Sequence, residues 1–598
     1  MKNNPHQATF AVPLPEKFRM PLCPYLMTGN HRLLVHLDAY GIPQSLQWPR
    51  PGAPDRLGFR NFCDEWPYWE EMTPEHLALL VPFFEYEDGK RDYLHDAANA
   101  YMDYIPDTNV LRGRYELPRG AVVEETLFVP PGEDVFFRHY HIEGKGKFVF
   151  QGEFFDKAVR GHALCKHGEI QFRGFLDAAP RGVFVILSSA ALTTKKQRTE
   201  TPVDNIADFD LLLAFGPDLL TASASGRKAS EKGFAALLEE TINSDRGWLS
   251  RAKEPVARHP FILKNYKRWL LSNMLLIAED GATVSGVRPF WTFAWPRDCA
   301  EQAYGFAAAG FLPEAEKIVR WNLDNLPESC VYEARYWSDG TPNLLDNRPR
   351  QGDSAGFLIW TAVYLYEIGK NEDFWASVRG KLLKLADHLV EAADSETMLP
   401  LPEADHREQI VAESLSTAAS AIGGLRALSS LLKAKGEGTR AESYRRRAEE
   451  ILQAVLANLW DEKEKYFITS VKPTDVKADI SICWGALPFR ILAADDPRMV
   501  GGIMKIYREN WNVEAGGVLS MGGTAYASYW MYYTSLLLLG MKWIGAREKE
   551  EEILDSLAKN ALPQGLIPEQ VSFATGRLWG CAPLPPPQAN LLYYAFLS

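Results

Sequence analysis

The pattern of hydrophobic and polar positions changes character between residues 230 and 260. Before this region, short runs rich in β-branched and aromatic residues alternate with turn-forming Pro and Gly. The runs cover residues 33–37, 122–129, 135–142, 148–155, 183–187 and 209–215. Runs of this kind between turn signals predict β-strands. A long series of them predicts a large antiparallel β-sandwich.

After residue 260 the pattern is helical to the end of the chain. It predicts twelve helices, which begin near residues 261, 298, 313, 353, 372, 414, 440, 481, 497, 525, 547 and 586. Several of them, such as the one that holds Phe357 and Trp360, are apolar on most of their circumference, which indicates a buried helix. Twelve helices that alternate between buried and more polar predict six inner and six outer helices, which is an (α/α)6 barrel.

The chain is therefore expected to have three parts. They are an N-terminal antiparallel β-sandwich domain over residues 1–227, a helical linker over 228–258 and an (α/α)6-barrel domain over 259–598. Of the 598 residues, 46% are hydrophobic and 24% are charged, which is typical of a folded protein. The net charge of −12 argues against binding to nucleic acid or to an anionic membrane, because both need clustered Lys and Arg.

The sequence also predicts a cytoplasmic protein. Residues 1–18 lack the apolar segment of a signal peptide. The most hydrophobic stretch, 536–544, is too short for a membrane span and contains Lys542. The seven cysteines are scattered and include no CxxC pair, which is typical of reduced thiols and not of a disulfide framework or a zinc site.

Four polar clusters interrupt the helical half, at residues 291–298, 348–353, 406–409 and 567–570. Each precedes an even-numbered helix of the predicted twelve. In a ring of antiparallel helical hairpins all even helices point the same way, so we expect the four clusters on one rim, around one funnel. Taken singly, Asp298 and Asp353 also fit helix caps, and Arg407–Glu408 also fits a solvated surface pair. Taken together, and with tryptophans nearby, the clusters favour a functional site.

Two carboxylates on opposite sides of a pocket suit the cleavage of a glycosidic bond. One, kept protonated, gives its proton to the leaving oxygen, and the other takes a proton from water or attacks directly. Their separation decides between the two outcomes, at roughly 6.5–9.5 Å for inversion and about 5–5.5 Å for retention. The sequence leaves this distance open.

At these clusters the sequence resembles glycoside hydrolase family 15, the glucoamylase-like enzymes. Segment 295–298 is similar to the family's W-x-R-D motif, 348–353 to its next active-site loop, 406–409 with 414–417 to its R-W-E-E and S-x-S-T segments, and 565–571 to its G-L-x-P-E-Q segment. Segments 29–30, 38–41 and 48–50 are similar to the N-terminal domain of the prokaryotic members. The resemblance spans nearly the whole chain, and the W-x-R-D and G-L-x-P-E-Q motifs are its most specific parts.

The resemblance implies an inverting, exo-acting α-glucosidase that removes glucose from the non-reducing ends of α-linked gluco-oligosaccharides. By position, Glu408 would be the general acid and Glu569 the general base. Residues that would hold or line the sugar site are Trp295, Arg297, Asp298, Asp353, Arg407, Gln409, Gln570 and Trp579. The family usually has Trp at the position of Arg407 and often Glu at that of Gln409, so these two departures leave the acceptor subsite and the linkage preference open.

Other functions stay open at this stage. Family 15 also contains trehalases and dextran-releasing glucosidases. A disaccharide phosphorylase with the same two domains would use one carboxylate and bind phosphate, and a non-catalytic carbohydrate-binding protein is a third alternative. The resemblance implies no cofactor. His139 and His141 are expected to be structural and not metal ligands, while a structural Ca²⁺ stays open. The oligomeric state is not predicted.

Overall fold

The structure is a computed structural model, and it describes residues 25–53, 81–151, 160–166, 169–176, 179–195, 198–287, 291–344, 348–408, 410–519, 528–572, 578–579 and 581–597. Within these ranges, side chains are described except at 151–183, 194–198 and 572–579. The chain divides into two compact units. The first comprises residues 1–250, 274–276 and 287–290, and the second comprises 251–273, 277–286 and 291–598. The main division falls where the sequence changes from strand to helix patterns.

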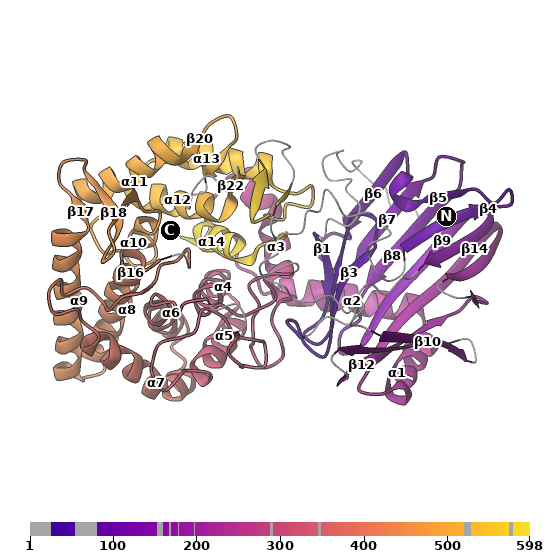
Figure 1. Cartoon of the computed structure of the whole chain (residues 1–598), viewed down its shortest axis with the longest axis horizontal. Helices are drawn as coiled ribbons and strands as arrows, with labels where there is room; N and C mark the ends of the chain where they lie inside the picture. Colours follow the sequence, from indigo (N-terminus) through magenta and orange to yellow (C-terminus); the bar gives the residue numbers. More distant parts are fainter. Residues whose placement is uncertain are drawn as a thin grey trace. The chain divides into compact units, whose positions relative to one another are not determined.

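The first unit contains two antiparallel sheets (Figure 1). The smaller has the order β1–β2–β3, formed by Leu26–Gly29, Leu34–Leu37 and Pro43–Gln47. The larger has the order β10–β11–β12–β14–β9–β8–β7–β6, with β4 beside β9, β5 beside β4 and β13 beside β14. Its strands are β4 (Val81–Tyr86), β5 (Arg91–Tyr93), β6 (Asn99–Tyr104), β7 (Leu111–Glu116), β8 (Val122–Phe128), β9 (Val135–Gln151), β10 (Arg160–Lys166), β11 (Glu169–Leu176), β12 (Ala179–Ser188), β13 (Thr193–Lys195) and β14 (Arg198–Gly216), and a 3-10 helix spans Leu94–Asp96.

The long strands β9 and β14 form the centre of the larger sheet, paired from Val135 opposite Ala214 to Gln151 opposite Arg198. Two helices, α1 (Leu219–Lys232) and α2 (Phe234–Leu249), bury their apolar faces against this sheet in one hydrophobic core. Residues 228–258, for which the sequence predicts a linker, hold the end of α1 and all of α2. An amphipathic helix is stabilised by burying its apolar face, and the sheet supplies the surface.

The second unit is built on twelve helices among the described residues. The outer ones are α3 (Pro260–Met274), α5 (Leu312–Asp324), α7 (Glu372–Glu391), α9 (Gly438–Asn458), α11 (Pro497–Asn510) and α13 (Arg547–Asn560). The inner ones are α4 (Pro296–Ala308), α6 (Ser354–Gly369), α8 (Leu415–Ala434), α10 (Ile482–Ala486), α12 (Met531–Ile544) and α14 (Pro585–Phe596). Each inner helix contacts the next, and α14 contacts α4, so the inner ring is closed (Figure 1). This is an (α/α)6 barrel.

Inner helices can approach closely where they carry small residues. A Cβ added to Gly356 of α6 would lie 2.2 Å from the carbonyl carbon of Ser420 in α8, and one added to Gly424 would lie 2.8 Å from the oxygen of Gly356. The glycines therefore let two buried helices touch through their backbones. The rest of α6 is apolar and mostly buried, which is why its sequence is hydrophobic around the whole circumference.

The predicted fold class is confirmed: antiparallel sheets come first and an (α/α)6 barrel follows. Eleven of the twelve barrel helices begin within two residues of the predicted position. The tenth was predicted to begin near residue 525 but begins at Met531. Residues 528–530 form strand β22 instead, and its pairing with β23 moves the start of the helix toward the C-terminus.

Short strands connect the barrel helices at two places. One sheet has the order β15–β16–β18–β17 with β19 beside β18, formed by Glu403–Ala404, Val411–Ser414, Tyr466–Val471, Trp460–Asp461 and Asp475–Ala478. The other has the order β20–β21–β22–β23–β24, formed by Trp511–Asn512, Gly517–Leu519, Ser528–Trp530, Gln570–Ser572 and Leu578–Trp579. Glu408 lies between β15 and β16, and Glu569 immediately precedes β23. The two sheets therefore hold the backbone next to both candidate carboxylates.

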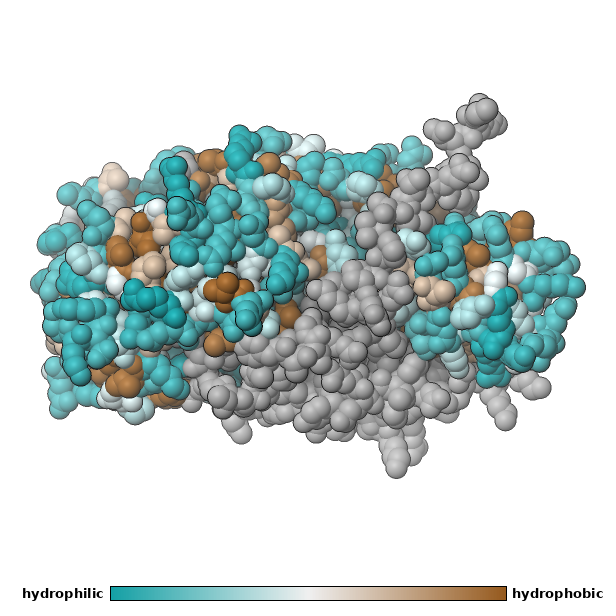
Figure 2. Space-filling model, turned by 90° about the horizontal axis from the view of Figure 1, so that it is seen from above, coloured by the Kyte–Doolittle hydropathy of each residue, from teal (hydrophilic) through white to brown (hydrophobic). Residues whose placement is uncertain are grey.

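On the face drawn in Figure 2 the described surface is mainly hydrophilic, and its apolar patches are small and separated by polar side chains. Exposed large apolar residues include Leu220, Leu344, Val476 and Val513, which are distant in sequence. Among the described residues, no helix has the length and hydropathy that a bilayer crossing requires.

Candidate active site

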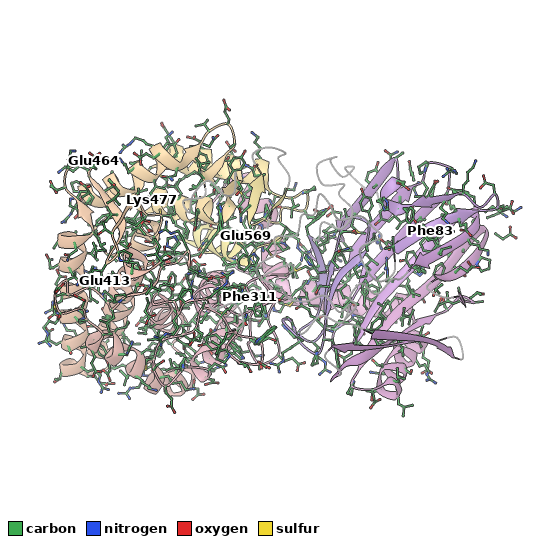
Figure 3. All side chains as sticks on the ribbon, in the orientation of Figure 1. Phe83, Phe311, Glu413, Glu464, Lys477 and Glu569 are labelled. Atoms are coloured by element: carbon green, nitrogen blue, oxygen red, sulfur yellow. The ribbon has the colours of Figure 1, made fainter. Side chains whose placement is uncertain are left out.

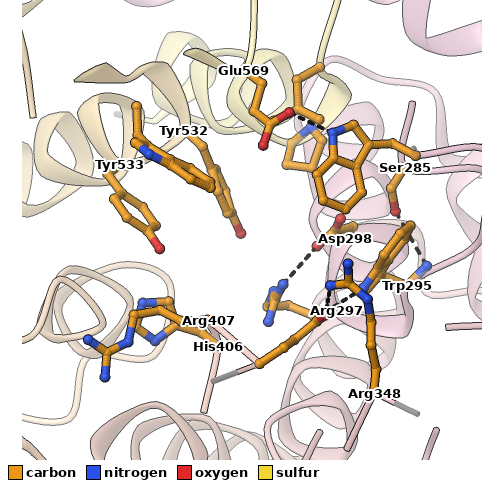
Figure 4. A pocket seen from close by; sticks show the side chains of 15 residues that line it. Ser285, Trp295, Arg297, Asp298, Arg348, His406, Arg407, Tyr532, Tyr533 and Glu569 are labelled. Atoms are coloured by element: carbon orange, nitrogen blue, oxygen red, sulfur yellow. Dashed lines mark hydrogen bonds and ion pairs between the residues drawn. The ribbon is translucent and has the colours of Figure 1, made fainter. Parts of the chain in front are cut away.

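One cavity of about 120 Å³ lies in the barrel unit (Figure 4). It is lined by Ser285, Trp291, Trp295, Arg297, Asp298, Arg348, His406, Arg407, Glu408, Trp530, Tyr532, Tyr533, Glu569, Leu584 and Pro586. These residues lie before, or in the first turn of, the inner helices α4, α6, α8, α12 and α14. The four polar clusters thus meet at one end of the ring, as the parity of the helices predicts.

Glu569 is a buried carboxylate at this cavity, with an exposed fraction of 2%. Its Oε2 accepts hydrogen bonds from Trp291 Nε1 at 2.5 Å and from the backbone N–H of Cys581 at 2.9 Å. Its Oε1 accepts from Gln570 Nε2 at 3.2 Å. Burial raises the pKa of Glu569, while the hydrogen bonds act in the opposite direction. Figure 3 shows Glu569 within the ring, among the C-terminal elements.

Glu408 approaches the cavity from a tight turn. Its N–H donates to the carbonyl of Asp405 at 2.9 Å, and its own φ is 59°, in the left-handed region that non-glycine residues rarely adopt. Backbone strain of this kind concentrates at functional sites. The Oε1 of Glu408 accepts from Trp295 Nε1 at 2.6 Å and from Gln351 Nε2 at 3.0 Å, and its Oε2 is ion-paired with Arg348.

Two neighbouring indoles hold the two carboxylates. Trp291 donates to Glu569 and Trp295 donates to Glu408, and their rings meet edge to face with centroids 5.2 Å apart. Both tryptophans belong to the segment that leads into α4. The segment that leads into α4 therefore contacts both carboxylates.

A buried charge network forms another part of the wall. The Arg297 guanidinium lies 3.1 Å from the Asp353 carboxylate and 3.3 Å from that of Asp298. Burial alone would lower the pKa of Arg297, but Asp353, Tyr532 and Asp298 together raise it well above its usual range. Burial raises the pKa of Asp298, opposed by Arg297. Arg297 and Asp298 reach the cavity, whereas Asp353 is fully buried behind Arg297 and holds it in place.

Arg407 does not behave as a solvated surface charge. Its side chain is 5% exposed, and it pairs with Asp405 at 2.6 Å and with Asp475 at 3.2 Å. Next to it, His406 is buried with its ring edge-on to Trp484, and burial lowers the pKa of His406. Both side chains line the cavity beside Glu408, as Figure 4 shows for the two labelled residues.

The remaining predicted site residues lie behind the cavity or outside the described part. Gln570 is fully buried, donates to Glu569 and accepts from Ser528 Oγ at 2.6 Å, so it orients the carboxylate from behind. Gln409 lies outside the described residues. The backbone of Trp579 belongs to β24, and its side chain is outside the description.

No protein-family model matches the chain. An uncharacterised glycosyl hydrolase of Methanocaldococcus jannaschii is 22% identical over 363 residues, which are 56% of this chain and 57% of that protein. This chain thus matches little more than half the length of that relative. A solved bacterial glucoamylase in complex with acarbose superposes on 99% of this chain and on 95% of its own, with a TM-score of 0.72 and 14% identity.

The chain has the fold of a glucoamylase. The superposition extends over both units, so the resemblance noted in the sequence motifs is confirmed for the fold. In this glucoamylase fold, the segments 295–298, 348–353, 406–408 and 567–570 come from four parts of the barrel and contribute to one site.

Sequence reasoning missed several residues of the site. Tyr532 and Tyr533 line the cavity from the first turn of α12. The predicted helix start near residue 525 placed them inside a helix, away from its N-terminal end. With the correct start, helix parity brings them to the same rim as the four clusters. Arg348 and Gln351 belong to a predicted cluster, but their contacts with Glu408 were not predicted. These contacts depend on the tight turn at Glu408, which leaves no signal in the sequence.

The described residues contain no group of three or more His, Cys, Asp or Glu side chains that is placed to hold a metal ion. His139 and His141 lie on β9, and each binds an aspartate of β14, with His139 Nδ1 2.8 Å from Asp210 and His141 Nδ1 2.7 Å from Asp208. The pair therefore cross-links two strands.

Proposed function

We propose that this chain is a glycoside hydrolase, and more narrowly an inverting, exo-acting α-glucosidase. The observation that carries the proposal is a cavity with two carboxylates, each held by its own tryptophan, beside a buried Arg–Asp pair. Two positioned carboxylates are what hydrolysis of a glycosidic bond requires. Buried polar groups beside indole faces suit the hydroxyls and the apolar faces of a sugar ring.

Glu569 has the properties of the general base. The donors around it are uncharged, and burial raises its pKa, so it binds a proton from water more strongly than an exposed carboxylate does. The Trp291 and Cys581 hydrogen bonds fix Oε2 and leave Oε1 with the weaker Gln570 contact. We therefore assign Oε1 as the atom that receives the proton.

Glu408 has the position of the general acid. Because Trp295 and Gln351 already occupy Oε1, the proton that Glu408 gives to the leaving oxygen belongs on Oε2, beside Arg348. Trp295 and Gln351 are buried, whereas the Arg348 side chain is 24% exposed. Arg348 is therefore the donor that moves when Glu408 gains its proton and faces a glycosidic oxygen.

Action at chain ends follows from the roles that the resemblance gives to the cavity residues. Arg297 and Asp298 would bind hydroxyls of the terminal glucose, and Trp295 would line its site. The solved glucoamylase with the same fold binds acarbose, which supports α-linked gluco-oligosaccharides as the substrates.

Proton NMR of reactions with maltose, maltotriose, isomaltose, isomaltotriose and trehalose, in buffer without phosphate, tests this function. We expect β-glucose to appear first from at least one of the sugars. Early α-glucose would contradict inversion. Activity that needs added phosphate would indicate a phosphorylase, and the absence of products with and without phosphate would contradict the proposal of a glucosidase.

The NMR assay needs matched variants. Glu408→Gln and Glu569→Gln remove the proposed acid and base with little change of shape. Glu550→Gln is the control, because Glu550 is also buried and accepts a hydrogen bond from a tyrosine, Tyr594, at 2.9 Å, but it lies on the outer helix α13. Product formation should be lost in the first two variants and retained in the third.

We also propose a reducing, cytoplasmic location. Cys299, Cys330 and Cys483 are buried free thiols, which suits a reducing compartment. Detection of the protein in the culture medium of cells with intact membranes would overturn this assignment.

A further inference from the structure

A further buried carboxylic acid, Glu301, lies among the inner helices next to a residue of the cavity wall. Glu301 is on α4, one helical turn after Asp298, and its side chain is fully buried. It does not line the cavity, but its neighbour Tyr532 does. Burying an ionisable group without a counter-ion is costly, so this position calls for an explanation.

The hydrogen-bond partners of Glu301 are neutral groups. Its Oε1 accepts from Trp484 Nε1 at 3.0 Å and lies 3.4 Å from the Tyr304 hydroxyl. Its Oε2 lies 2.8 Å from the Tyr532 hydroxyl. Tyr304 lies closer to Asn590 Oδ1, at 2.5 Å, and donates its proton there.

The charged groups around Glu301 oppose each other. Burial is the main influence and raises the pKa of Glu301 to about 8, Asp298 adds to the rise, and Arg297 acts against it. Arg297 and Asp298 are on the same helix, and the facing helices contribute Tyr532 from α12, Trp484 from α10 and Asn590 from α14. Burial also raises the pKa of Tyr532 well above its usual range, so this phenol keeps its proton.

The position of one proton then decides what Tyr532 can do. Indole Nε1 is a donor only, so Oε1 of Glu301 is already occupied as an acceptor, and a proton on Glu301 belongs on Oε2. From Oε2 it is donated to the oxygen of Tyr532. Tyr532 has a single hydroxyl hydrogen. When protonated Glu301 donates to the Tyr532 oxygen, this hydrogen no longer bonds to Glu301 and is available to an acceptor in the cavity.

We propose that protonated Glu301 is a positioning residue for the sugar site: it makes Tyr532 a hydrogen-bond donor toward a hydroxyl oxygen of the bound sugar. When Glu301 loses its proton, the carboxylate takes the hydrogen of Tyr532, and the sugar loses that donor. Tyr532 lines the same cavity as Arg297 and Asp298, and its hydroxyl lies 2.8 Å from Glu301 on their helix, so the phenol would contact the same sugar unit beside them. This inference rests on the proposed glucosidase function.

The test measures KM and kcat between pH 5.5 and 9.5 with whichever glucoside the wild-type protein cleaves. A neutral hydrogen bond corresponds to roughly a two- to tenfold change in affinity. We expect the wild-type KM to rise by this factor above pH 8. Glu301→Gln should keep the low KM and lose this rise, because its amide N–H₂ also donates to Tyr532. Tyr532→Phe should have the raised KM at every pH, because it has no phenol hydrogen to donate. Glu301→Leu should lose the rise, because leucine offers no acceptor that could take the hydrogen of Tyr532 from the sugar.

Two controls separate this inference from other effects. Glu550→Gln removes a buried carboxyl that is also bonded to a tyrosine, and it should keep the wild-type pH dependence. Glucose binding, followed by tryptophan fluorescence at pH 6.5 and 9, should weaken at the higher pH in the wild type but not in Glu301→Gln. This readout requires no turnover and reports on Tyr532 even if Glu301→Leu fails to fold.

The outcomes are distinguishable. If no glucoside is cleaved, the proposed function fails. If a glucoside is cleaved but Glu301→Gln keeps the wild-type rise in KM, or Tyr532→Phe binds as tightly as the wild type, the assignment of Glu301 is wrong and the proposed function stands.

Discussion

The two units each contain a fully buried carboxylate, but the partners of the two carboxylates differ. In the sheet unit, Glu125 pairs with Arg138 at 2.9 Å, and both side chains have zero exposure. In the barrel unit, Glu301 has Trp484 and Tyr532 as hydrogen-bond partners, and both are neutral. A counter-ion keeps a buried carboxylate charged, whereas neutral donors leave its protonation to respond to pH. The sheet unit thus pairs Glu125 with a buried cation, whereas the barrel leaves Glu301 to neutral donors.

The largest expected effect is that of Glu569→Gln, which should lower the catalytic rate of the barrel without lowering its stability. Glu569→Gln removes the proposed base while its neutral donors remain, so we expect kcat to fall by about 10²–10⁴-fold. The melting temperature should stay the same or rise, because a buried carboxyl with a raised pKa is replaced by a neutral amide. Steady-state kinetics and scanning calorimetry on the same preparation measure both. A large loss of stability would mean that Glu569 is structural like Glu125.

The sheet unit should show the opposite response. Arg138→Met leaves Glu125 buried without its cation, which typically costs about 3–5 kcal/mol of unfolding free energy. In a unit of this size we expect a drop in melting temperature on the order of 10 °C.

The double variant Glu125→Gln/Arg138→Met controls for lost packing, since Arg138 also lies over the Tyr140 ring at 5.2 Å. It should recover much of the loss, because no buried charge remains. Equal losses in the single and double variants would show that packing, and not charge, stabilises this site.

A pH series of melting temperatures sharpens the contrast at Glu301. Its pKa is raised to about 8 in the folded state from an ordinary value of 4.5. Between these values the folded chain holds a proton that the unfolded chain has released, so stability falls as pH rises through this window. The change is on the order of a few kcal/mol, at 1.36 kcal/mol for each pH unit.

Glu301→Gln should abolish this component. The melting temperature of the variant relative to the wild type should therefore rise between pH 5 and 8. Parallel curves would show that Glu301 is ionised in the folded protein at pH 5 and would contradict its role toward Tyr532.

The sequence predicted the architecture well for a physical reason. Apolar periodicity records which face of a helix is buried, so it located the twelve helices and, through their parity, the shared rim of the cavity. The local turns left no such record. The left-handed conformation of Glu408 and the shift of α12 to Met531 both depend on contacts with distant segments. Buried polar contacts such as that between Glu301 and Tyr532 are equally invisible, because they join residues far apart in the sequence.

The smallest expected effect concerns an exposed pair on the same sheet as Glu125. His141 Nδ1 lies 2.7 Å from Asp208, and the two side chains are 24% and 53% exposed. Burial lowers the pKa of His141, but the bond to Asp208 outweighs it and the net shift is upward. The folded state therefore favours the protonated imidazole, so the pair contributes stability below pH 6.5, and this contribution is lost as pH rises through the raised pKa. Because solvent screens such a pair, Asp208→Asn should cost only a few tenths of a kcal/mol at pH 5.5 and nothing measurable at pH 8.5. We expect burial, and not the mere presence of opposite charges, to set how much an ion pair in this sheet contributes to the unfolding free energy. If Asp208→Asn lost as much unfolding free energy as Arg138→Met, this expectation would be wrong.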